Sequence, residues 1–462
     1  MYWSNVHAQA VEFRSRNPAT NEVVGRYPVM SDAELGSILD AAVAAQLRWR
    51  ISSLDERRRL VVQLAKSLLT YREDAARLAA IEMGKPIAQG RAEIEKCAWA
   101  CRSLAEQAVA ALAPMTVPTE FSISQVHFDP LGVVLAIMPW NFPFWQVIRA
   151  AVPSLLAGNA VVVNHSPEVT GCALLLQRIA DSCGLGGVYR TILATHEQIA
   201  SIIADRRIAA VTLTGSTRAG RIVASLAGQF LKKTVLELGG SDPYIVLADA
   251  DLPKAVETCV AARMVNSGQS CIAAKRFIVH QRIAAQFEEM FVEQMRSYQP
   301  EDPLDERTVL GPLARVDLAH TLARQAQQSI ERGARSLLEG GPTGTGAFVR
   351  PIVLSNVTPG MAAFDEETFG PLAAITVAGD DAEAVALANR SSYGLGAAVF
   401  TEDPERAERI VSQLEAGSVF VNAFVRSDPR LPFGGIKDSG WGRELSPFGL
   451  REFVNVKTVV MA

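Results

Sequence analysis

The chain has 462 residues, a length that predicts two or three domains because a single hydrophobic core does not extend over so long a chain. Hydrophobic residues make up 49% and charged residues 20%, which is typical of a globular protein with much buried surface. The formal net charge of −4 provides no positive field for a polyanion, so nucleic acid is excluded as an expected partner.

The N-terminal residues 1–7 have neither the basic start nor the apolar run of a secretory signal. The longest apolar stretches, such as 132–140, are too short to span a membrane. Six cysteines in a chain of this length do not predict a disulfide framework. The six histidines are scattered, with no metal-binding spacing. We therefore expect a soluble cytoplasmic protein with no membrane partner and no metal.

The sequence pattern of the first hundred residues predicts helices. Ser31-Asp-Ala-Glu34 is a capping box that opens an apolar run to about residue 49. A second helix is expected from Leu54 to the stop signal at 84–86, and a third is expected from Arg91.

From residue 132, short apolar strands alternate with helices. This alternation predicts parallel sheets covered by helices on both faces, with ligands beyond the carboxyl ends of the strands. A first set of strands is expected at 133–138, 160–163, 190–193, 210–214 and 234–238, and a second at 244–247, 276–280, 374–377, 397–401 and 418–422. The expected helices cover 169–183, 218–228, 252–266, 283–297, 316–332, 382–390 and 404–415.

Two short motifs predict covalent acyl chemistry. Gly-Gln-Ser-Cys271 sets a thiol in a glycine-marked loop, and Glu237-Leu-Gly-Gly240 sets a carboxylate before two residues without side chains. A thiolate attacks a carbonyl carbon, and a carboxylate activates the water that later releases the acyl group. Taken singly, Cys271 could be a buried inert cysteine and Glu237 a strand-end carboxylate in a salt bridge.

Three further motifs follow the same order as in a known family. They are Pro139-Trp-Asn-Phe-Pro143, Glu367-Thr-Phe-Gly-Pro371, and Pro432-Phe-Gly-Gly-Ile-Lys437 leading into Ser439-Gly-Trp-Gly-Arg443. Together with the two motifs above, they make the chain resemble the aldehyde dehydrogenase superfamily from end to end. The stretches 139–149, 268–276 and 427–435 are similar to the bacterial succinate-semialdehyde dehydrogenase branch.

The resemblance implies NAD(P)-dependent oxidation of an aldehyde to an acid through a thiohemiacetal and a thioester. Cys271 would be the nucleophile, and Asn141 would hold the oxyanion through its amide N–H. Glu237 would activate the water that hydrolyses the thioester. A structural alternative for Asn141 is an asparagine that fixes the turn after the strand.

The expected cofactor is NAD or NADP, although the chain has no Gly-x-Gly-x-x-Gly. Thr214–Gly220 lies at a strand-to-helix turn whose N–H groups could face a pyrophosphate, or it is an ordinary capped helix start. The resemblance assigns the dinucleotide to Trp140, Asn164, Ser166, Gly215, Ser216, Gly239, Glu367 and Phe369.

Asn164 departs from the family pattern, which has a lysine there that reaches the adenine ribose. Asparagine can bond a hydroxyl but carries no charge for a 2′-phosphate. Pro167 occupies the place of the ribose-binding carboxylate of many NAD-using relatives, and Ser166 could bond a hydroxyl or a phosphate. We expect NAD(P) binding, with a slight preference for NAD.

Substrate choice rests on charge, because a distal carboxylate needs a cation in the pocket. Arg149 matches an arginine implicated in the succinate-semialdehyde branch, unless it pairs with a structural acid on its helix. Ser427 and Arg430 offer a second anchor. Trp145, with Phe144 and Phe424, could equally line an apolar pocket for an aromatic aldehyde.

The predicted fold is α/β, with a Rossmann-like dinucleotide-binding domain (1–117 and 131–241) and an α/β catalytic domain (242–430). Segments 118–130 and 445–462 are expected to form a small β oligomerisation extension, in which the terminal strand pairs with the 118–130 ribbon across a subunit boundary. A homodimer or homotetramer is therefore expected.

The leading hypothesis is oxidation of succinate semialdehyde to succinate. Alternatives are a dehydrogenase for an aromatic or aliphatic aldehyde, a cofactor-poor thiol esterase that keeps Cys271, Asn141 and Glu237, and a non-catalytic binding protein.

Overall fold

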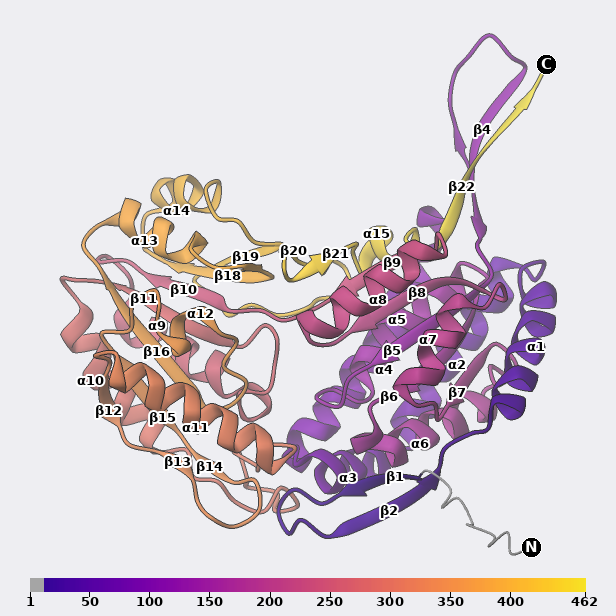
Figure 1. Cartoon of the computed structure of the whole chain (residues 1–462). Helices are drawn as coiled ribbons and strands as arrows, with labels where there is room; N and C mark the ends of the chain where they lie inside the picture. The colour runs from indigo at the N-terminus through magenta and orange to yellow at the C-terminus, as the bar shows by residue number, and fades with distance from the viewer. Residues whose placement is uncertain (1–11) are drawn as a thin grey trace, which may run out of the picture.

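The computed structural model describes residues 12–462, which form two α/β units and a projecting β ribbon (Figure 1). Residues 1–11, where the sequence was inspected for a secretory signal, lie outside the described part. Between residues 12 and 462, no helix is both long and apolar enough to cross a membrane.

The N-terminal helices are α1 (Asp32–Trp49), α2 (Leu54–Thr70), α3 (Arg72–Met83) and α4 (Ile87–Ala111). The predicted capping box is confirmed, because Ser31 accepts the Glu34 N–H and the Glu34 carboxylate accepts the Ser31 N–H. The single helix expected from Leu54 is two, since the chain turns at Tyr71 (φ −93°, ψ 16°) so that both halves pack against α4. Helix α4 begins at Ile87, earlier than predicted.

The first α/β unit contains a six-stranded sheet that is parallel except for one edge strand, the one that comes last in the sequence. The chain runs from the centre outward through three strands, then returns to the other side of the first one. This reversal is the switch point at which ligands bind in such sheets. In spatial order the strands are β21 (Gly440–Trp441), β9 (Lys233–Glu237), β8 (Ile208–Thr214), β5 (Val133–Met138), β6 (Ala160–His165) and β7 (Tyr189–Ile192), with helices α5 (Trp145–Leu156), α6 (Thr170–Ser182), α7 (His196–Ala204), α8 (Thr217–Gln229) and α15 (Ser446–Leu450).

The second α/β unit contains a seven-stranded sheet in which one edge strand is antiparallel. The predicted α/β architecture with parallel sheets is thus confirmed in both halves. In spatial order the strands are β12 (Arg335–Leu338), β15 (Ile352–Ser355), β16 (Leu372–Ala378), β11 (Ala274–His280), β10 (Asp242–Val246), β18 (Gly396–Phe400) and β19 (Ser418–Val421), with helices α9 (Leu252–Met264), α10 (Ala284–Arg296), α11 (Val316–Glu331), α12 (Ala362–Asp365), α13 (Asp381–Asn389) and α14 (Pro404–Val411).

The projecting ribbon consists of β3 (Met115–Thr116), β4 (Ile123–Pro130) and the terminal strand β22 (Val454–Met461) (Figure 1). β22 pairs antiparallel with β4 from Val454 opposite Pro130 to Met461 opposite Ile123. The expected partners therefore pair within one chain rather than across a subunit boundary. The reason is geometric, since the last helix returns the chain to the base of β4.

Short contacts outside the sheets join the two units. Strands β1 (Glu12–Arg16) and β2 (Val23–Pro28) form a hairpin that the sequence analysis did not predict. The Pro18 carbonyl, in the loop of this hairpin, accepts the Ala347 N–H (2.8 Å). At the start of α4, the Ile87 N–H donates to the Pro303 carbonyl (2.8 Å). Two small strand pairs complete the structure: β13 (Gly341–Pro342) with β14 (Val349–Arg350), and β17 (Tyr393–Gly394) with β20 (Ile436–Lys437).

Aromatic side chains fill the core of the second unit. Phe277 is fully buried, and its ring centroid lies 4.8 Å from that of Phe291 and 6.1 Å from that of Tyr244. This cluster supports β11, the strand that follows Cys271.

Phe277→Ala is expected to lower the free energy of unfolding by about 3–5 kcal/mol, because it leaves a cavity that rigid neighbours do not close. Calorimetry should show a lower denaturation temperature. Phe230→Ala is the matched control, since that ring is 44% exposed at the end of α8. Equal effects of the two variants would contradict the assigned core.

Candidate active site

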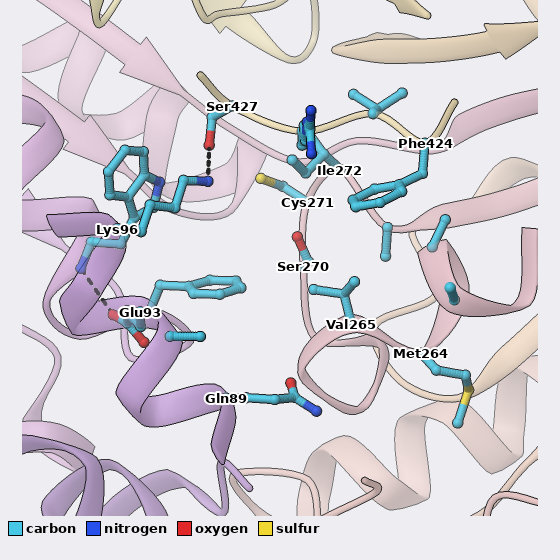
Figure 2. Close-up of a pocket in the computed structure, with 18 of the residues that line it drawn as sticks. Gln89, Glu93, Lys96, Met264, Val265, Ser270, Cys271, Ile272, Phe424 and Ser427 are labelled. Carbon is cyan, nitrogen blue, oxygen red and sulfur yellow. Dashed lines mark hydrogen bonds between the residues drawn. The ribbon is translucent and has the colours of Figure 1, made fainter. Parts of the chain in front are cut away.

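A cavity of about 540 Å³ lies between the two units, and Cys271 is in its wall. Helices α4 and α5 form one side; the thiol loop (residues 265–273) and the late loop (residues 422–435) form the other (Figure 2). Cys271 precedes β11, so it lies at the amino end of that strand and not at a carboxyl end. Besides Cys271, the lining includes Gln89, Glu93, Lys96, Phe142, Trp145, Gln146, Arg149, Val265, Phe424, Arg426, Ser427 and Phe433.

The thiol loop turns through three successive left-handed residues: Asn266 (φ 52°), Ser267 (φ 56°) and Gly268 (φ 76°). The first two adopt a conformation that costs L-residues free energy. A Cβ at Gly268 would come within 2.4 Å of the Gly370 carbonyl oxygen, so only glycine fits there.

Hydrogen bonds from both units hold this turn. The Asn266 amide donates to the Asn141 carbonyl (2.8 Å), and Ser267 Oγ exchanges hydrogen bonds with Gly311 (3.1 Å each). The buried Arg263 guanidinium donates to the Gly268 carbonyl (2.6 Å). The strained backbone is therefore fixed before any ligand binds.

The Cys271 thiol faces an apolar environment that disfavours its charged form. Burial raises the pKa of Cys271 to about 12, against the opposing effect of the Arg149 and Lys275 cations. The Lys275 ammonium donates to the carbonyls of Ser270 (2.9 Å) and Cys271 (2.7 Å), which anchors the backbone at the thiol.

Asn141 follows β5 at the switch point of the first sheet and is buried. Its Nδ2 donates to the Gln269 carbonyl (3.1 Å), two residues before Cys271. An amide nitrogen carries a second N–H, which remains for a ligand.

His165 at the end of β6 lies 3.1 Å from the Pro143 carbonyl, and burial lowers the pKa of this imidazole to about 4.

Glu237 ends β9 and is only 2% exposed, yet neither carboxylate oxygen has a hydrogen-bond partner within residues 12–462. Burial and the neighbouring Glu444 raise the pKa of Glu237 well above its usual range, while Arg149 opposes the shift. Glu237 does not line the cavity that holds Cys271; a Cβ at Gly434 would lie 2.8 Å from its Oε1. The salt bridge considered for Glu237 does not form in this part of the chain.

Arg149 on α5 lines the cavity but is already partnered. It forms a buried ion pair with Glu444, and its guanidinium lies 4.6 Å from the Phe433 ring centroid. Its Nη2 also donates to Thr214 Oγ1 (3.3 Å). A structural acid therefore pairs with Arg149, although the acid comes from the C-terminal segment and not from the same helix.

The remaining substrate candidates separate into two groups. Trp145 and Ser427 line the cavity, whereas Arg430 lies outside its lining and pairs with Asp428 (2.6 Å). Lys96, which sequence reasoning missed, donates to Ser427 Oγ (2.8 Å) (Figure 2). The available signal was a lysine directly before the apolar run 97–101, which begins at the buried Cys97.

The candidate cofactor residues gather around the ends of β5, β6, β8 and β9. Trp140 and Phe369 contact edge to face, with centroids 5.7 Å apart. Glu367 Oε1 accepts the Gly240 N–H (2.9 Å), and a Cβ at Gly239 would come within 2.7 Å of Glu367 Oε2. Burial raises the pKa of Glu367, with Lys275 opposing.

The predicted ribose and pyrophosphate positions already have partners within the protein. Asn164 Oδ1 accepts the Ala194 N–H (3.0 Å), and Ser166 Oγ donates to the Glu168 carboxylate, which pairs with Arg315 (2.9 Å). Ser216 caps α8 by accepting the Ala219 N–H (3.2 Å). At the preceding Gly215, an added Cβ would have a Leu213 side-chain atom as its nearest neighbour, 3.6 Å away.

No group of three or more histidine, cysteine, aspartate or glutamate side chains that could hold a metal ion occurs in the described range 12–462.

Comparison with known proteins places this geometry in context. The model of the aldehyde dehydrogenase family matches residues 5–459. The chain is 47% identical to the succinate semialdehyde dehydrogenase [NAD(P)+] Sad of Escherichia coli, over 96% of this chain and 97% of that protein. It is 43% identical to a probable succinate-semialdehyde dehydrogenase [NADP(+)] of Synechocystis, over 96% and 99% of the two chains.

Solved structures agree with these sequence matches. The succinic semialdehyde dehydrogenase of Streptococcus pyogenes in complex with NADP+ has a TM-score of 0.94 at 33% identity, covering 97% of this chain and 99% of that one. The succinate-semialdehyde dehydrogenase of Burkholderia pseudomallei has a TM-score of 0.94 at 32% identity, covering 98% and 95%. With a partly buried thiol, an adjacent amide and a family match that spans almost its whole length, this chain belongs to the aldehyde dehydrogenase family.

Proposed function

We propose that the protein oxidises succinate semialdehyde to succinate, with NAD or NADP as hydride acceptor. The observation that carries the proposal is the cavity, which holds the Cys271 thiol together with cationic side chains in a wall of mainly apolar residues. The names of its relatives support the same substrate and cofactor.

In the proposed first step, the Cys271 thiolate forms a bond to the aldehyde carbon and the carbonyl π electrons move to oxygen. The second N–H of the Asn141 amide stabilises this oxyanion, a contribution of about 3 kcal/mol in comparable sites. Because burial raises the pKa of Cys271, the proton must leave to a base or the thiolate must gain stabilisation from a bound ligand.

A nicotinamide nucleotide, when bound, supplies the acceptor for the hydride that leaves the tetrahedral carbon. The product on Cys271 is a thioester, which water must hydrolyse to release the acid and restore the thiol. Glu237 is proposed to take a proton from that water by turning toward Cys271, since its carboxylate has no hydrogen-bond partner within residues 12–462. Burial raises the pKa of Glu237, which makes its carboxylate, once ionised, a stronger base toward that water.

The residues around the strand ends fit a dinucleotide. Gly239 and Gly215 leave space that a side chain would fill, and the free N–H groups that begin α8 suit a pyrophosphate. We propose that Glu367 holds the nicotinamide ribose beside Trp140 and Phe369, with Ser216 at the phosphates. Asn164 and Ser166 would then face the adenine ribose, Asn164 through its amide nitrogen because Oδ1 is already bonded.

The proposed division of labour follows the two units, with residues 1–117 and 131–241 binding the dinucleotide and residues 242–430 carrying the thiol. We propose assembly into a homodimer or homotetramer through segments 118–130 and 445–462, because Val456, Val460 and Met461 of β22 are exposed apolar residues on a free strand edge. A cytoplasmic location is proposed with it.

A second candidate is oxidation of a neutral aromatic aldehyde. Phe142, Trp145, Phe424 and Phe433 line the cavity and would accept a ring. This candidate leaves the cations of the cavity without a role, so it ranks second.

The assay that tests the proposal measures the absorbance of reduced nicotinamide with succinate semialdehyde, butyraldehyde and benzaldehyde, each with NAD and NADP. The highest kcat/KM is expected for the semialdehyde, because only it carries a carboxylate for the cavity cations. A higher kcat/KM for either neutral aldehyde would reject the substrate while keeping the chemistry.

Glu237→Gln is expected to slow turnover by about 10²- to 10⁴-fold through loss of the general base, while an initial burst of reduced nicotinamide persists. Rapid-mixing kinetics would measure the burst, and Cys271→Ala should show neither burst nor turnover. Full steady-state turnover in Glu237→Gln would remove Glu237 from the proposed role.

Arg149→Met is expected to lower the free energy of unfolding by about 3–5 kcal/mol, because Glu444 then remains buried without its cation. Replacing both, as Arg149→Met with Glu444→Leu, should regain most of that loss in urea unfolding. If the single variant were as stable as the wild type, the ion pair would not support the fold. Reduced activity of an Arg149 variant therefore does not by itself identify a substrate anchor.

A further inference from the structure

The cavity has four charged lining residues, and two of them are matched by buried partners. Arg149 pairs with Glu444, as described above. Glu93 pairs with the buried Lys85 and accepts the N–H groups that begin α5. The charge of each is therefore already balanced by a buried partner of opposite sign.

The other two lining charges are Lys96 and Arg426, and they differ in position. Arg426 is exposed, with its guanidinium 5.9 Å from the Phe424 ring centroid, so it lies at the rim. Lys96 is largely buried within the wall, and among residues 12–462 no carboxylate lies within ion-pair distance of its ammonium.

We propose that Lys96, together with Ser427, binds the distal carboxylate of the substrate and thereby determines the preference for an acidic aldehyde. This assignment rests on the proposed function, and it gives Lys96 the role that the sequence had suggested for Arg149.

The geometry around Lys96 prepares a two-point carboxylate site. The ammonium lies 4.3 Å from the Trp145 ring centroid and donates one of its three N–H groups to Ser427 Oγ (2.8 Å). Because Ser427 accepts that hydrogen bond, its own O–H stays free to donate. One carboxylate oxygen can then take an N–H of Lys96 and the other the O–H of Ser427.

The placement relative to the thiol suits a short chain between aldehyde and carboxylate. Lys96 projects from α4 and Cys271 from the thiol loop, and both enter the same space from facing walls (Figure 2). A substrate whose aldehyde carbon reaches Cys271 would direct its other end toward Lys96 and Ser427.

The charge environment supports binding of an anion at neutral pH. Burial lowers the pKa of Lys96 to about 8, and Arg149 on α5 adds to that shift. Glu93 and Cys97 on α4 and Asp428 in the late loop act in the opposite direction but do not pair with it. A carboxylate beside the ammonium would favour the charged form and raise its pKa.

The sign of the pH dependence follows from this arrangement. Below about pH 8 the free enzyme carries the charged ammonium and binds the carboxylate; above it the ammonium loses its proton and the attraction disappears. The KM for succinate semialdehyde should therefore rise above about pH 8, whereas the KM for butyraldehyde, which has no carboxylate, should not follow this titration.

The test compares wild type, Lys96→Met and Lys96→Arg on succinate semialdehyde and butyraldehyde, two four-carbon aldehydes. Lys96→Met should raise the KM for the semialdehyde by about 10- to 100-fold, with kcat little changed, because the variant loses a hydrogen bond from a charged group to the substrate. Its kinetics with butyraldehyde should stay as in the wild type, and Lys96→Arg should retain part of the preference. Lys254→Met, at an exposed lysine of α9, is the control.

The outcomes separate this inference from the proposed function. If wild type prefers the semialdehyde and Lys96→Met keeps the same preference and pH profile, Lys96 is not the anchor and the proposed function stands. If wild type itself shows no such preference, the proposed substrate fails. Should Lys96→Met unfold, which circular dichroism would show, Lys96→Arg and Ser427→Ala still decide, since an unchanged KM for the semialdehyde in both would overturn the proposal.

Discussion

The left-handed turn of the thiol loop is the constraint on which the arrangement of the site depends. Asn266 and Ser267 adopt positive φ at a cost, and hydrogen bonds from outside the loop compensate for it. One of these bonds runs to the carbonyl of Asn141, whose side chain in turn donates to Gln269. Asn141 and the loop that carries Cys271 thus fix one another, although they come from different α/β units.

The second organising feature is the matching of buried charges. Arg149 with Glu444 and Lys85 with Glu93 are buried ion pairs, and each would leave an uncompensated charge if one member were removed. Such pairs place charged groups in the cavity wall, but each of these charges is already balanced by its partner within the protein. We propose that the cavity recognises its substrate through Lys96, which has no ion-pair partner within residues 12–462, rather than through the paired Arg149.

Much of the fold could be predicted from the sequence, because apolar runs and helix signals are local. Ten strands of the two sheets fall close to the predicted ranges, whereas β12, β15 and β21 were not predicted; the capping box at Ser31 forms as expected. The break at Tyr71 could not be predicted in this way, since it results from the packing of α2 and α3 on α4. The intrachain pairing of β22 with β4 likewise depends on where the last helix delivers the chain.

The candidate site was predictable in its residues but not in their contacts. Motifs identified Cys271, Asn141 and Glu237 as candidates, whereas the acid opposite Arg149 comes from Glu444, a distant segment that no local pattern links to α5. Lys96 escaped notice because a lysine on a helix usually extends its ammonium to solvent. Only the tertiary structure shows that its surroundings here are Trp145 and Ser427.

The contacts of the β1–β2 hairpin with Ala347 and of α4 with Pro303 bear on how molecules enter and leave the cavity. They join the two α/β units in addition to the chain crossings between the sheets, and neither contact involves Cys271. Opening the cavity by separating the units would break these backbone hydrogen bonds together with the Asn141–Asn266 bond. Exchange of substrate and product through local movement of side chains and the late loop is therefore favoured over a hinge motion of whole units.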